Sequence, residues 1–134
     1  MTDPIRLLLA DDQQMVRAGF RLVLDAQPDM SVVGEANDGA EALQLVDELA
    51  PDVVLMDIRM PVLDGLGATE KIMTSHPEAK ILVLTTFDLD EYVHSALRAG
   101  ASGFMLKDAG PTELLAAIRA VRDGDSVVAP SATR

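Results

Sequence analysis

The chain has 134 residues, about the usual size of one domain and too few for two ordinary ones. Its formal net charge of -11 argues against direct binding of DNA or RNA, because a protein that holds phosphates needs a positive face. It has no cysteine, no apolar run longer than a strand and no signal-peptide pattern, so we expect one globular cytoplasmic domain without disulfides, thiolate metal sites or membrane contact.

The first half of the sequence alternates short apolar runs with segments of helical period. Residues 5–10 form a strand-length apolar run, and apolar residues over 16–24 have the spacing of one helix face. Residues 31–35 predict a second strand, and residues 42–49 predict a second helix that a following proline ends. Residues 53–56 are apolar without alternation, as expected for a strand covered on both faces.

The second half continues the alternation and then fades. In chain order we expect a turn over 61–65, a helix through Ile72 that stops near His76, a strand over 81–84, a helix over 93–97 capped by Gly100, a strand over 103–106 and a last helix from Pro111 to Val121. From Gly124 to Arg134 the periodicity gives way to Gly, Ser, Pro and Ala, which is typical of a linker.

Five strands that alternate with five helices predict an α/β doubly wound fold, with a parallel sheet covered on both sides. Ligands in such folds bind beyond the carboxyl ends of the strands. The residues that directly follow the predicted strands are therefore the candidate site: Asp11, Asp12, Asp57, Thr85 and Lys107.

These residue types suit phosphoryl transfer assisted by Mg²⁺. Carboxylate oxygens are ligands that Mg²⁺ prefers, and Asp57 at the end of a buried strand needs a cation such as Mg²⁺ or Lys107 to compensate its charge. Asp57 is the expected nucleophile, with Mg²⁺ and Lys107 neutralising the phosphoryl oxygens and the Thr85 hydroxyl donating to the new group.

Five motifs in this order resemble the receiver domain of bacterial two-component response regulators, from about residue 5 to residue 123. They are Asp11-Asp12, Asp57 with Met60-Pro61, Asp64-Gly65, Thr85, and Gly103-Phe104-Met105-Leu106-Lys107.

The resemblance implies a flavodoxin-like (βα)5 fold with strand order 2-1-3-4-5. It also implies that Asp57 accepts a phosphoryl group from a sensor histidine kinase, in a signalling domain that catalyses its own phosphorylation and is not an enzyme. Asp57, Asp12 and the backbone carbonyl of Arg59 would hold Mg²⁺, with Asp11 acting through water. Thr85 and Phe104 would form a switch.

Further detail is similar to the subgroup with a LuxR-type (NarL/FixJ-like) helix-turn-helix output domain, in the segments 8–12, 56–61 and 100–108. This similarity implies transcription regulation, homodimers on phosphorylation, and DNA contact only through an output domain that lies outside these 134 residues. We expect residues 1–123 to be the receiver domain and 124–134 to begin the linker. A stand-alone receiver or a phosphorelay intermediate is the alternative.

Two other classes of protein also place phosphate chemistry on a doubly wound sheet. A phosphatase of the haloacid-dehalogenase type needs a second aspartate two residues after the nucleophile, where this chain has Arg59. A flavodoxin-like FMN carrier needs amides and hydroxyls in the first strand-to-helix loop, where this chain has Asp11 and Asp12. Arg59 therefore disfavours the phosphatase, and the Asp11-Asp12 pair disfavours the FMN carrier.

Several of the same residues also have a simpler structural interpretation. Asp11 or Asp12 could cap the first helix, and Asp64 is expected to cap the third. Asp108 replaces the proline that many receivers have after the lysine, so a trans Lys107–Asp108 bond is expected. Arg59 and Phe87 occupy the two positions that usually hold the hydrolytic water, which predicts a long-lived phosphoryl group.

Overall fold

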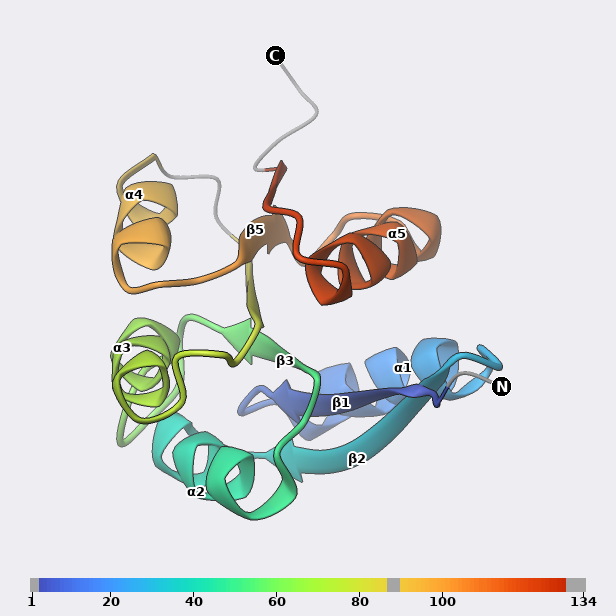
Figure 1. Cartoon of the computed structure of the whole chain (residues 1–134), viewed down its shortest axis with the longest axis horizontal. Helices are drawn as coiled ribbons and strands as arrows, with labels where there is room; N and C mark the ends of the chain where they lie inside the picture. The colour runs from blue at the N-terminus through green and yellow to red at the C-terminus, as the bar shows by residue number, and fades with distance from the viewer. Residues whose placement is uncertain (1–2, 87–89, 130–134) are drawn as a thin grey trace.

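Strands and helices alternate along the chain as the apolar pattern predicts. The computed structural model describes residues 3–86 and 90–129 (Figure 1). The elements are β1 Ile5–Ala10, α1 Gln14–Asp25, β2 Met30–Ala36, α2 Gly39–Leu49, β3 Val53–Asp57, α3 Gly65–Ser75, β4 Ile81–Thr85, α4 Asp90–Arg98, β5 Gly103–Leu106, α5 Pro111–Arg122 and β6 Val127–Ala129.

The strands form one parallel sheet in the order β2-β1-β3-β4-β5-β6. The predicted order of the first five strands is confirmed. The strand order reverses at β1, because β2 lies on one side of it and β3 on the other. The loops that follow β1 and β3 therefore lead to opposite faces of the sheet. A crevice for chemistry is expected at that point.

The sixth strand was not predicted from the sequence. Helix α5 ends in a Schellman motif, in which Gly124 has a φ of 97° and the amides of Gly124 and Asp125 donate to the carbonyls of Val121 and Ala120. This turn sends the chain back along β5, where Val127 pairs with Gly103. A Cβ at Gly103 would lie 2.9 Å from the Val127 carbonyl oxygen, so glycine permits the close approach of β6.

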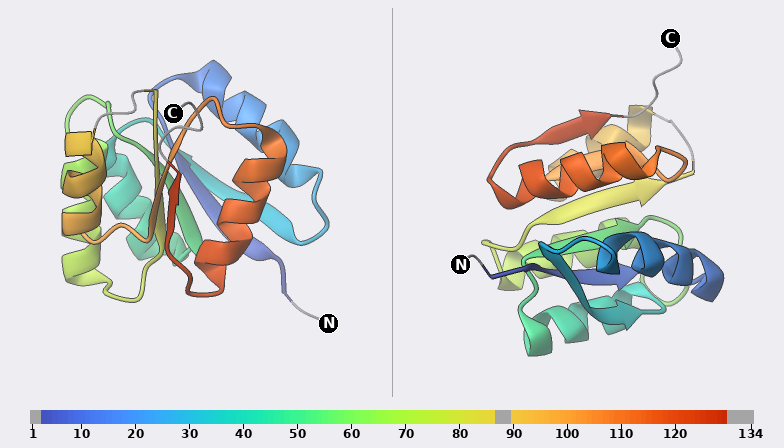
Figure 2. Two further views of the ribbon diagram at one scale, coloured as in Figure 1. Left: turned by 90° about the horizontal axis from the view of Figure 1, so that it is seen from above. Right: turned by 90° about the vertical axis from the view of Figure 1, so that its right-hand side faces the viewer.

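Two apolar cores lie on opposite faces of the sheet, because successive strand residues point to opposite sides. In β3, Val53 and Leu55 pack in the core under α1 and α5, whereas Val54 and Met56 pack in the core under α2, α3 and α4. Figure 2 shows this arrangement, with α1 and α5 on one side of the sheet and α2, α3 and α4 on the other. The absence of alternation in β3 is thereby explained, since all five of its residues are buried.

Local signals place the helix ends close to the predicted positions. The Asp64 side chain accepts a hydrogen bond of 2.7 Å from the Gly67 amide and caps α3, as predicted. Gly100 has a φ of 103° just beyond α4, and Pro111 begins α5. No described helix is long and apolar enough to cross a membrane.

Candidate functional site

The carboxyl ends of β1 and β3 bring three carboxylates together. Ala10 pairs with Met56 in the sheet, so the residues that follow, Asp11 and Asp57, emerge side by side. One carboxylate oxygen from each of Asp11, Asp12 and Asp57 lies within 4.8 Å of the others. The cluster combines two buried acids, Asp11 and Asp57, with the exposed Asp12.

Asp57 is the carboxylate at the end of the central strand, and it is 7% exposed. Burial raises the pKa of Asp57 to about 6 from the usual 3.8, although Lys107 opposes the shift. The charges of Asp11 and Asp12 raise this pKa further. The charge of the Asp57 carboxylate is therefore only partly compensated. A site that binds a further cation is expected to have such an uncompensated charge.

Lys107 supplies the cation that the structure itself provides. Its Nζ lies 2.5 Å from Asp11 Oδ2 and 3.3 Å from Asp57 Oδ2. The Lys107 backbone amide donates a hydrogen bond of 2.8 Å to the Thr85 carbonyl, which ties the end of β5 to the end of β4. The ammonium thus reaches the first and third strands from the fifth.

The loop after β3 is held tightly against the site. The Gly65 amide donates to the Ile58 carbonyl at 2.8 Å, and a Cβ at Gly65 would lie 1.9 Å from the carbonyl oxygen of Asp57. Only glycine fits at this position. The turn signal at Asp64-Gly65 therefore has two functions, a cap for α3 and close packing against the backbone of Asp57.

Thr85 and Phe104 lie where the sequence predicts them. Thr85 ends β4 and is buried, and Phe104 is fully buried in β5 among the residues of the second core. Val83 pairs with Phe104 and Thr85 pairs with Leu106, so Thr85 and Phe104 lie on neighbouring strands, two register positions apart. The Phe104 ring is therefore in the interior and not on the surface in this structure.

Other predicted positions have different outcomes. Arg59 is exposed and its Nη2 lies 3.5 Å from the Tyr92 hydroxyl across the loop. Phe87 lies outside the described residues. Among the described residues there is no cis peptide bond, so the trans Lys107–Asp108 bond is confirmed. Neither Asp11 nor Asp12 is the N-cap of α1, because Gln13 is the N-cap and makes no side-chain cap.

One residue of this region was missed in the sequence. Arg17 of α1 is buried, its Nε donates to Glu35 Oε1 at 2.9 Å, and its Nη1 donates to the Asp11 carbonyl. A signal was present, because Arg17 falls seven residues before Leu24 on the buried face of the helix. An arginine at a core-facing position requires partners, and both acceptors lie at strand ends beside the carboxylates.

The carboxylate cluster fits a divalent cation bound by oxygen. Three aspartates converge, and one of them is solvent-accessible. Lys107 compensates the charge of the buried Asp57 only in part. Mg²⁺ suits such a set because it prefers oxygen ligands, keeps several waters and needs only one or two carboxylates from the protein. Beside the cluster, a cavity of about 490 Å³ is lined by Asp12, Arg59, Pro61 and Tyr92, among others.

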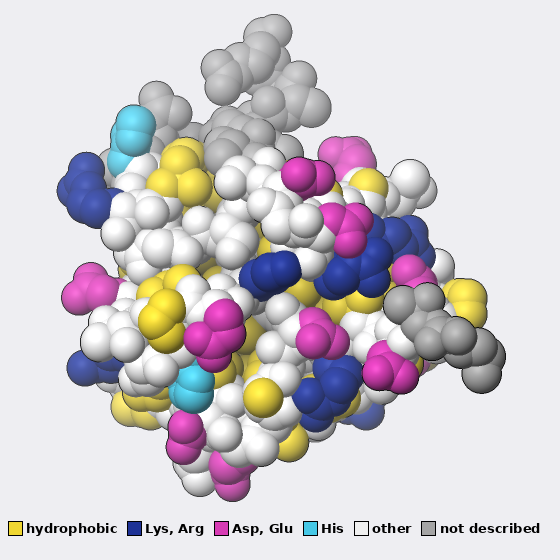
Figure 3. Space-filling view, viewed as in Figure 1, with side chains coloured by type: hydrophobic (Ala, Val, Ile, Leu, Met, Phe, Trp, Pro, Cys, Tyr) yellow, Lys and Arg dark blue, Asp and Glu magenta, His cyan; other side chains and the backbone are white. Residues whose placement is uncertain are grey.

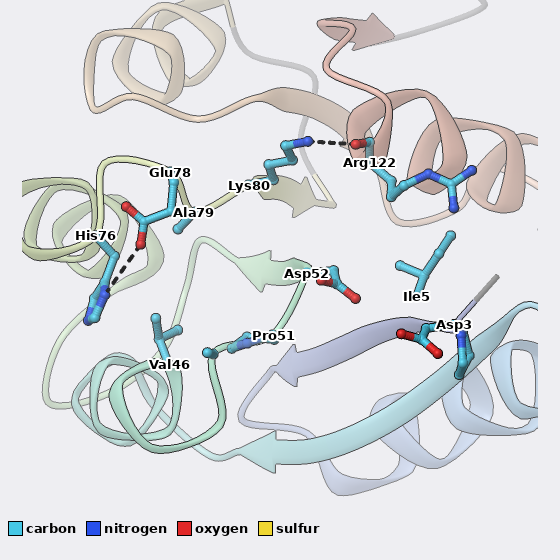
Figure 4. Close-up of a pocket in the computed structure, with 12 residues that line it drawn as sticks. Asp3, Ile5, Val46, Pro51, Asp52, His76, Glu78, Ala79, Lys80 and Arg122 are labelled. Carbon is cyan, nitrogen blue, oxygen red and sulfur yellow. Dashed lines mark hydrogen bonds and ion pairs between the residues drawn. The ribbon is translucent and has the colours of Figure 1, made fainter.

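A larger cavity of about 580 Å³ lies far from this chemistry, at the amino ends of the strands (Figure 4). Its walls carry Asp52, Glu78, Lys80 and Arg122 around an apolar floor, and the Lys80 ammonium donates to the Arg122 carbonyl at 2.5 Å. On the face seen in Figure 3, acidic and basic side chains are interspersed without a patch of one sign. The converging carboxylates, rather than cavity size, identify the candidate site.

Comparison with known proteins places this geometry in a defined family. The family described as response regulator receiver domain matches residues 7–119. The transcriptional regulatory protein YxjL of Bacillus subtilis is 51% identical over 125 residues, with 93% of this chain and 57% of that protein covered. The oxygen regulatory protein NreC of Staphylococcus aureus is 50% identical over 125 residues, with 92% of this chain and 58% of that protein covered. The chain therefore spans little more than half the length of these curated relatives.

Solved structures agree with the sequence comparison. A LuxR-family two-component response regulator from Aurantimonas sp. SI85-9A1 superimposes with a TM-score of 0.91 at 37% identity, covering 96% of this chain and 91% of that one. The signal receiver domain of NarL from Mycobacterium tuberculosis gives a TM-score of 0.88 at 35% identity, covering 92% and 99% of the two chains.

Proposed function

This chain belongs to the response regulator receiver family, as a receiver domain of the LuxR/NarL type, and we propose that Asp57 accepts a phosphoryl group from a sensor histidine kinase. One observation supports the assignment above the others. The Asp57 carboxylate ends the central strand, within ion-pair distance of Lys107 and beside the Asp11-Asp12 pair, which supports a nucleophile flanked by a cationic side chain and by acids that could bind a metal.

The proposed step is a displacement at phosphorus. An Asp57 carboxylate oxygen forms a bond to phosphorus as the bond to the donor group breaks, and the donor leaves with the electron pair. Lys107 Nζ, already 3.3 Å from Asp57 Oδ2, neutralises an oxygen of the transferred group. The protein contributes chiefly position and charge, because phosphoryl transfer needs little covalent chemistry from it.

Mg²⁺ belongs to the proposal as the cofactor of the transfer. Asp57, Asp12 and the Arg59 carbonyl would hold it directly, and Asp11 through a water molecule. When bound, it supplies positive charge to the phosphoryl oxygens and offsets repulsion between the donor and the three acids. The 4.8 Å limit on the spacing of the Asp11, Asp12 and Asp57 oxygens supports this assignment.

The proposal extends to signalling. The new phosphoryl group, with a charge of about −1.5 to −2, would accept a hydrogen bond from the Thr85 hydroxyl and change the packing around Phe104. Residues 1–123 would act as the receiver and 124–134 would lead, after β6, to a DNA-binding output domain. The match covers only 57% and 58% of the relatives named as transcriptional and oxygen regulators, which supports that reading. The domain would transfer and hold a phosphoryl group without enzymatic turnover.

Incubation with acetyl phosphate and Mg²⁺, followed by intact mass measurement, tests the proposal. We expect a gain of one acid-labile phosphoryl group per chain, and no gain when EDTA removes the metal before the donor is added. Continuous release of phosphate without a stable mass gain would instead indicate a phosphatase, which Arg59 in place of the second aspartate disfavours. No mass gain from either acetyl phosphate or phosphoramidate would contradict the proposed acceptor function.

A further inference from the structure

We propose that Arg17 is a positioning residue that aims Asp12 at the metal site. The proposal rests on the proposed function, because it takes Asp11, Asp12 and Asp57 as the residues that hold Mg²⁺. It goes beyond that function by assigning a role to a side chain of α1 that does not itself reach the carboxylates. The contact that carries it is the hydrogen bond from Arg17 Nη1 to the Asp11 carbonyl.

The Arg17 side chain is unusually buried for its type. Arg17 is 7% exposed, although arginine is seldom buried unless its charge is paired. Glu35, near the end of β2, pairs with it through a contact of 2.9 Å from Nε to Oε1. The planar guanidinium presents donors in a fixed fork, so binding Glu35 with one edge sets the direction of Nη1 toward Asp11. The pair acts as a brace between α1 and the sheet.

Holding the Asp11 carbonyl also fixes Asp12. The peptide unit between them is planar, so the orientation of the Asp11 carbonyl sets the positions of the Asp12 amide and Cα. Two further contacts secure the Asp11 side of this unit: its amide donates to the Ala36 carbonyl at 3.1 Å, and its Oδ1 accepts from the Gln13 amide at 2.8 Å. Rotation of the Asp11–Asp12 peptide would therefore break the bond to Arg17.

Asp12 depends on this backbone because its own side chain has no other anchor. It is exposed, and no hydrogen bond or ion pair to another described residue holds its carboxylate. A metal ligand binds well only when its direction is set before the ion arrives. For Asp12 that direction comes from the peptide that Arg17 holds.

Two carboxylates offset the charges of Arg17 and Arg21, so this group does not repel a cation: Glu35 contacts both guanidiniums, and Asp25 Oδ2 lies 3.2 Å from Arg21 Nε. Glu35 lies between Arg17 and Arg21, and Arg21 Nη1 contacts Glu35 Oε2 at 2.6 Å. Arg21 is a matched control for Arg17, because it binds the same carboxylate from the same helix but does not contact Asp11. Its side chain is 45% exposed.

The experiment measures the Mg²⁺ affinity of wild type, Arg17→Met and Arg21→Met. Each protein is titrated with MgCl₂, and binding is monitored by calorimetry and by the shifts of amide resonances. Loss of an outer contact to a metal ligand typically weakens binding 10- to 100-fold, so we expect the Mg²⁺ affinity of Arg17→Met to fall about tenfold. Arg21→Met should bind Mg²⁺ like wild type. Phosphorylation by acetyl phosphate should be slow in Arg17→Met at low Mg²⁺ and recover when Mg²⁺ saturates the site.

A purely structural role predicts a different pattern. Thermal unfolding in EDTA measures stability without the metal, and a lower melting temperature for Arg17→Met with an unchanged Mg²⁺ affinity would overturn the proposal. Should that variant not fold, the wild type decides: the Arg17 Nε–H resonance should shift with Mg²⁺ in parallel with the Asp12 amide, and an unmoved resonance refutes the role. Wild type without measurable Mg²⁺ binding would refute the metal site itself, a separate outcome.

Discussion

The charge of Asp57 destabilises the fold, because the strand that it ends is buried. The residues before it are buried on both faces, and the carboxylate inherits that environment with partial compensation by Lys107. Its raised pKa means that the fold binds the proton more tightly than the unfolded chain does. The contribution of Asp57 to stability is therefore largest below the unfolded pKa of 3.8 and is lost as pH rises through about 6.

Removal of this charge should stabilise the metal-free chain. A shift from 3.8 to about 6 corresponds to an effect of about 3 kcal/mol at neutral pH, so Asp57→Asn should unfold at a higher temperature than wild type in EDTA at pH 7.5. The difference should shrink as pH falls toward 4.5, where wild-type Asp57 is protonated. An equal or lower melting temperature for the variant at pH 7.5 would show that Lys107 fully compensates the carboxylate.

We also expect single side chains to affect the lifetime of the phosphoryl group. Hydrolysis needs a water in line with phosphorus, and neither Arg59 nor Phe87 can accept a proton from it. Displacement of a reactant by about 1 Å can slow a reaction on the order of a hundredfold. We therefore expect slow loss of the phosphoryl group in wild type and faster loss in Arg59→Asn and Phe87→Glu. The decay is followed by intact mass at fixed Mg²⁺. Equal or slower loss in both variants would remove the basis of this prediction.

At the scale of elements, a two-bond ion pair joins helix α5 to the loop before β2. Arg119 donates from Nε and Nη2 to the two carboxylate oxygens of Asp29, both at 2.9 Å. The hydrogen bonds from Arg119 hold the pKa of Asp29 below its ordinary value. A group with a lowered folded pKa stabilises the fold above its unfolded pKa and loses that effect as pH falls through the folded one.

This pair should make part of the stability dependent on acid pH. Wild type should lose stability relative to Arg119→Met as pH falls below 3.8, and the gap between them should be constant above pH 5. Thermal unfolding between pH 3 and pH 7 measures it, with Asp29→Asn as the second arm of a double-mutant cycle. The effect is small because both side chains are well exposed to solvent. A gap that does not change with pH argues against the pair.

Elements with a strong local signal were predictable, and those held by tertiary contacts were not. The apolar run before Asp57 is typical of a strand covered on both faces, which also predicts that the aspartate lies at the end of the strand. The three residues of β6 are too few for a periodic signal, and a helix cap at Gly124 directs them. Val62 is 83% exposed with a φ of 70°, a conformation that β-branched residues avoid. Backbone bonds at Leu63 hold it there.

The same division holds within the site. Asp11, Asp12, Asp57, Thr85 and Lys107 are placed at one rim by the order of the strands, which the alternation of elements predicts. Arg17 was missed because its partners, Asp11 and Glu35, come from other elements and an isolated arginine is usually on the surface. Sequence patterns identify residues at strand ends better than the side chains that support them.

At the scale of the whole molecule, the proposed site lies at one end of the sheet, and we expect its effects to pass through β4 and β5. Thr85, Phe104 and Lys107 belong to these strands or their ends, and β5 pairs with β6 along its outer edge. We therefore expect a change at Asp57 to reach the surface around α4 and β5. This surface is where we expect phosphorylation to alter association.

Phosphorylation should raise the dimer fraction of the chain. Sedimentation velocity of wild type with and without acetyl phosphate and Mg²⁺ measures it, and Asp57→Asn under both conditions is the control. Faster sedimentation only in the phosphorylated wild type is the expected result. An unchanged profile at full phosphorylation, verified by mass on the same sample, would count against the dimer while leaving the acceptor site intact.

Chemical mapping of the phosphorylated residue tests the central claim most directly. Borohydride reduces an aspartyl phosphate to homoserine, so treatment of the phosphorylated chain and peptide mass analysis reports the position of the acyl phosphate. We expect homoserine at position 57, and none in Asp57→Asn treated in the same way. Homoserine at another aspartate in wild type, or an undiminished mass gain in Asp57→Asn, would contradict the assignment.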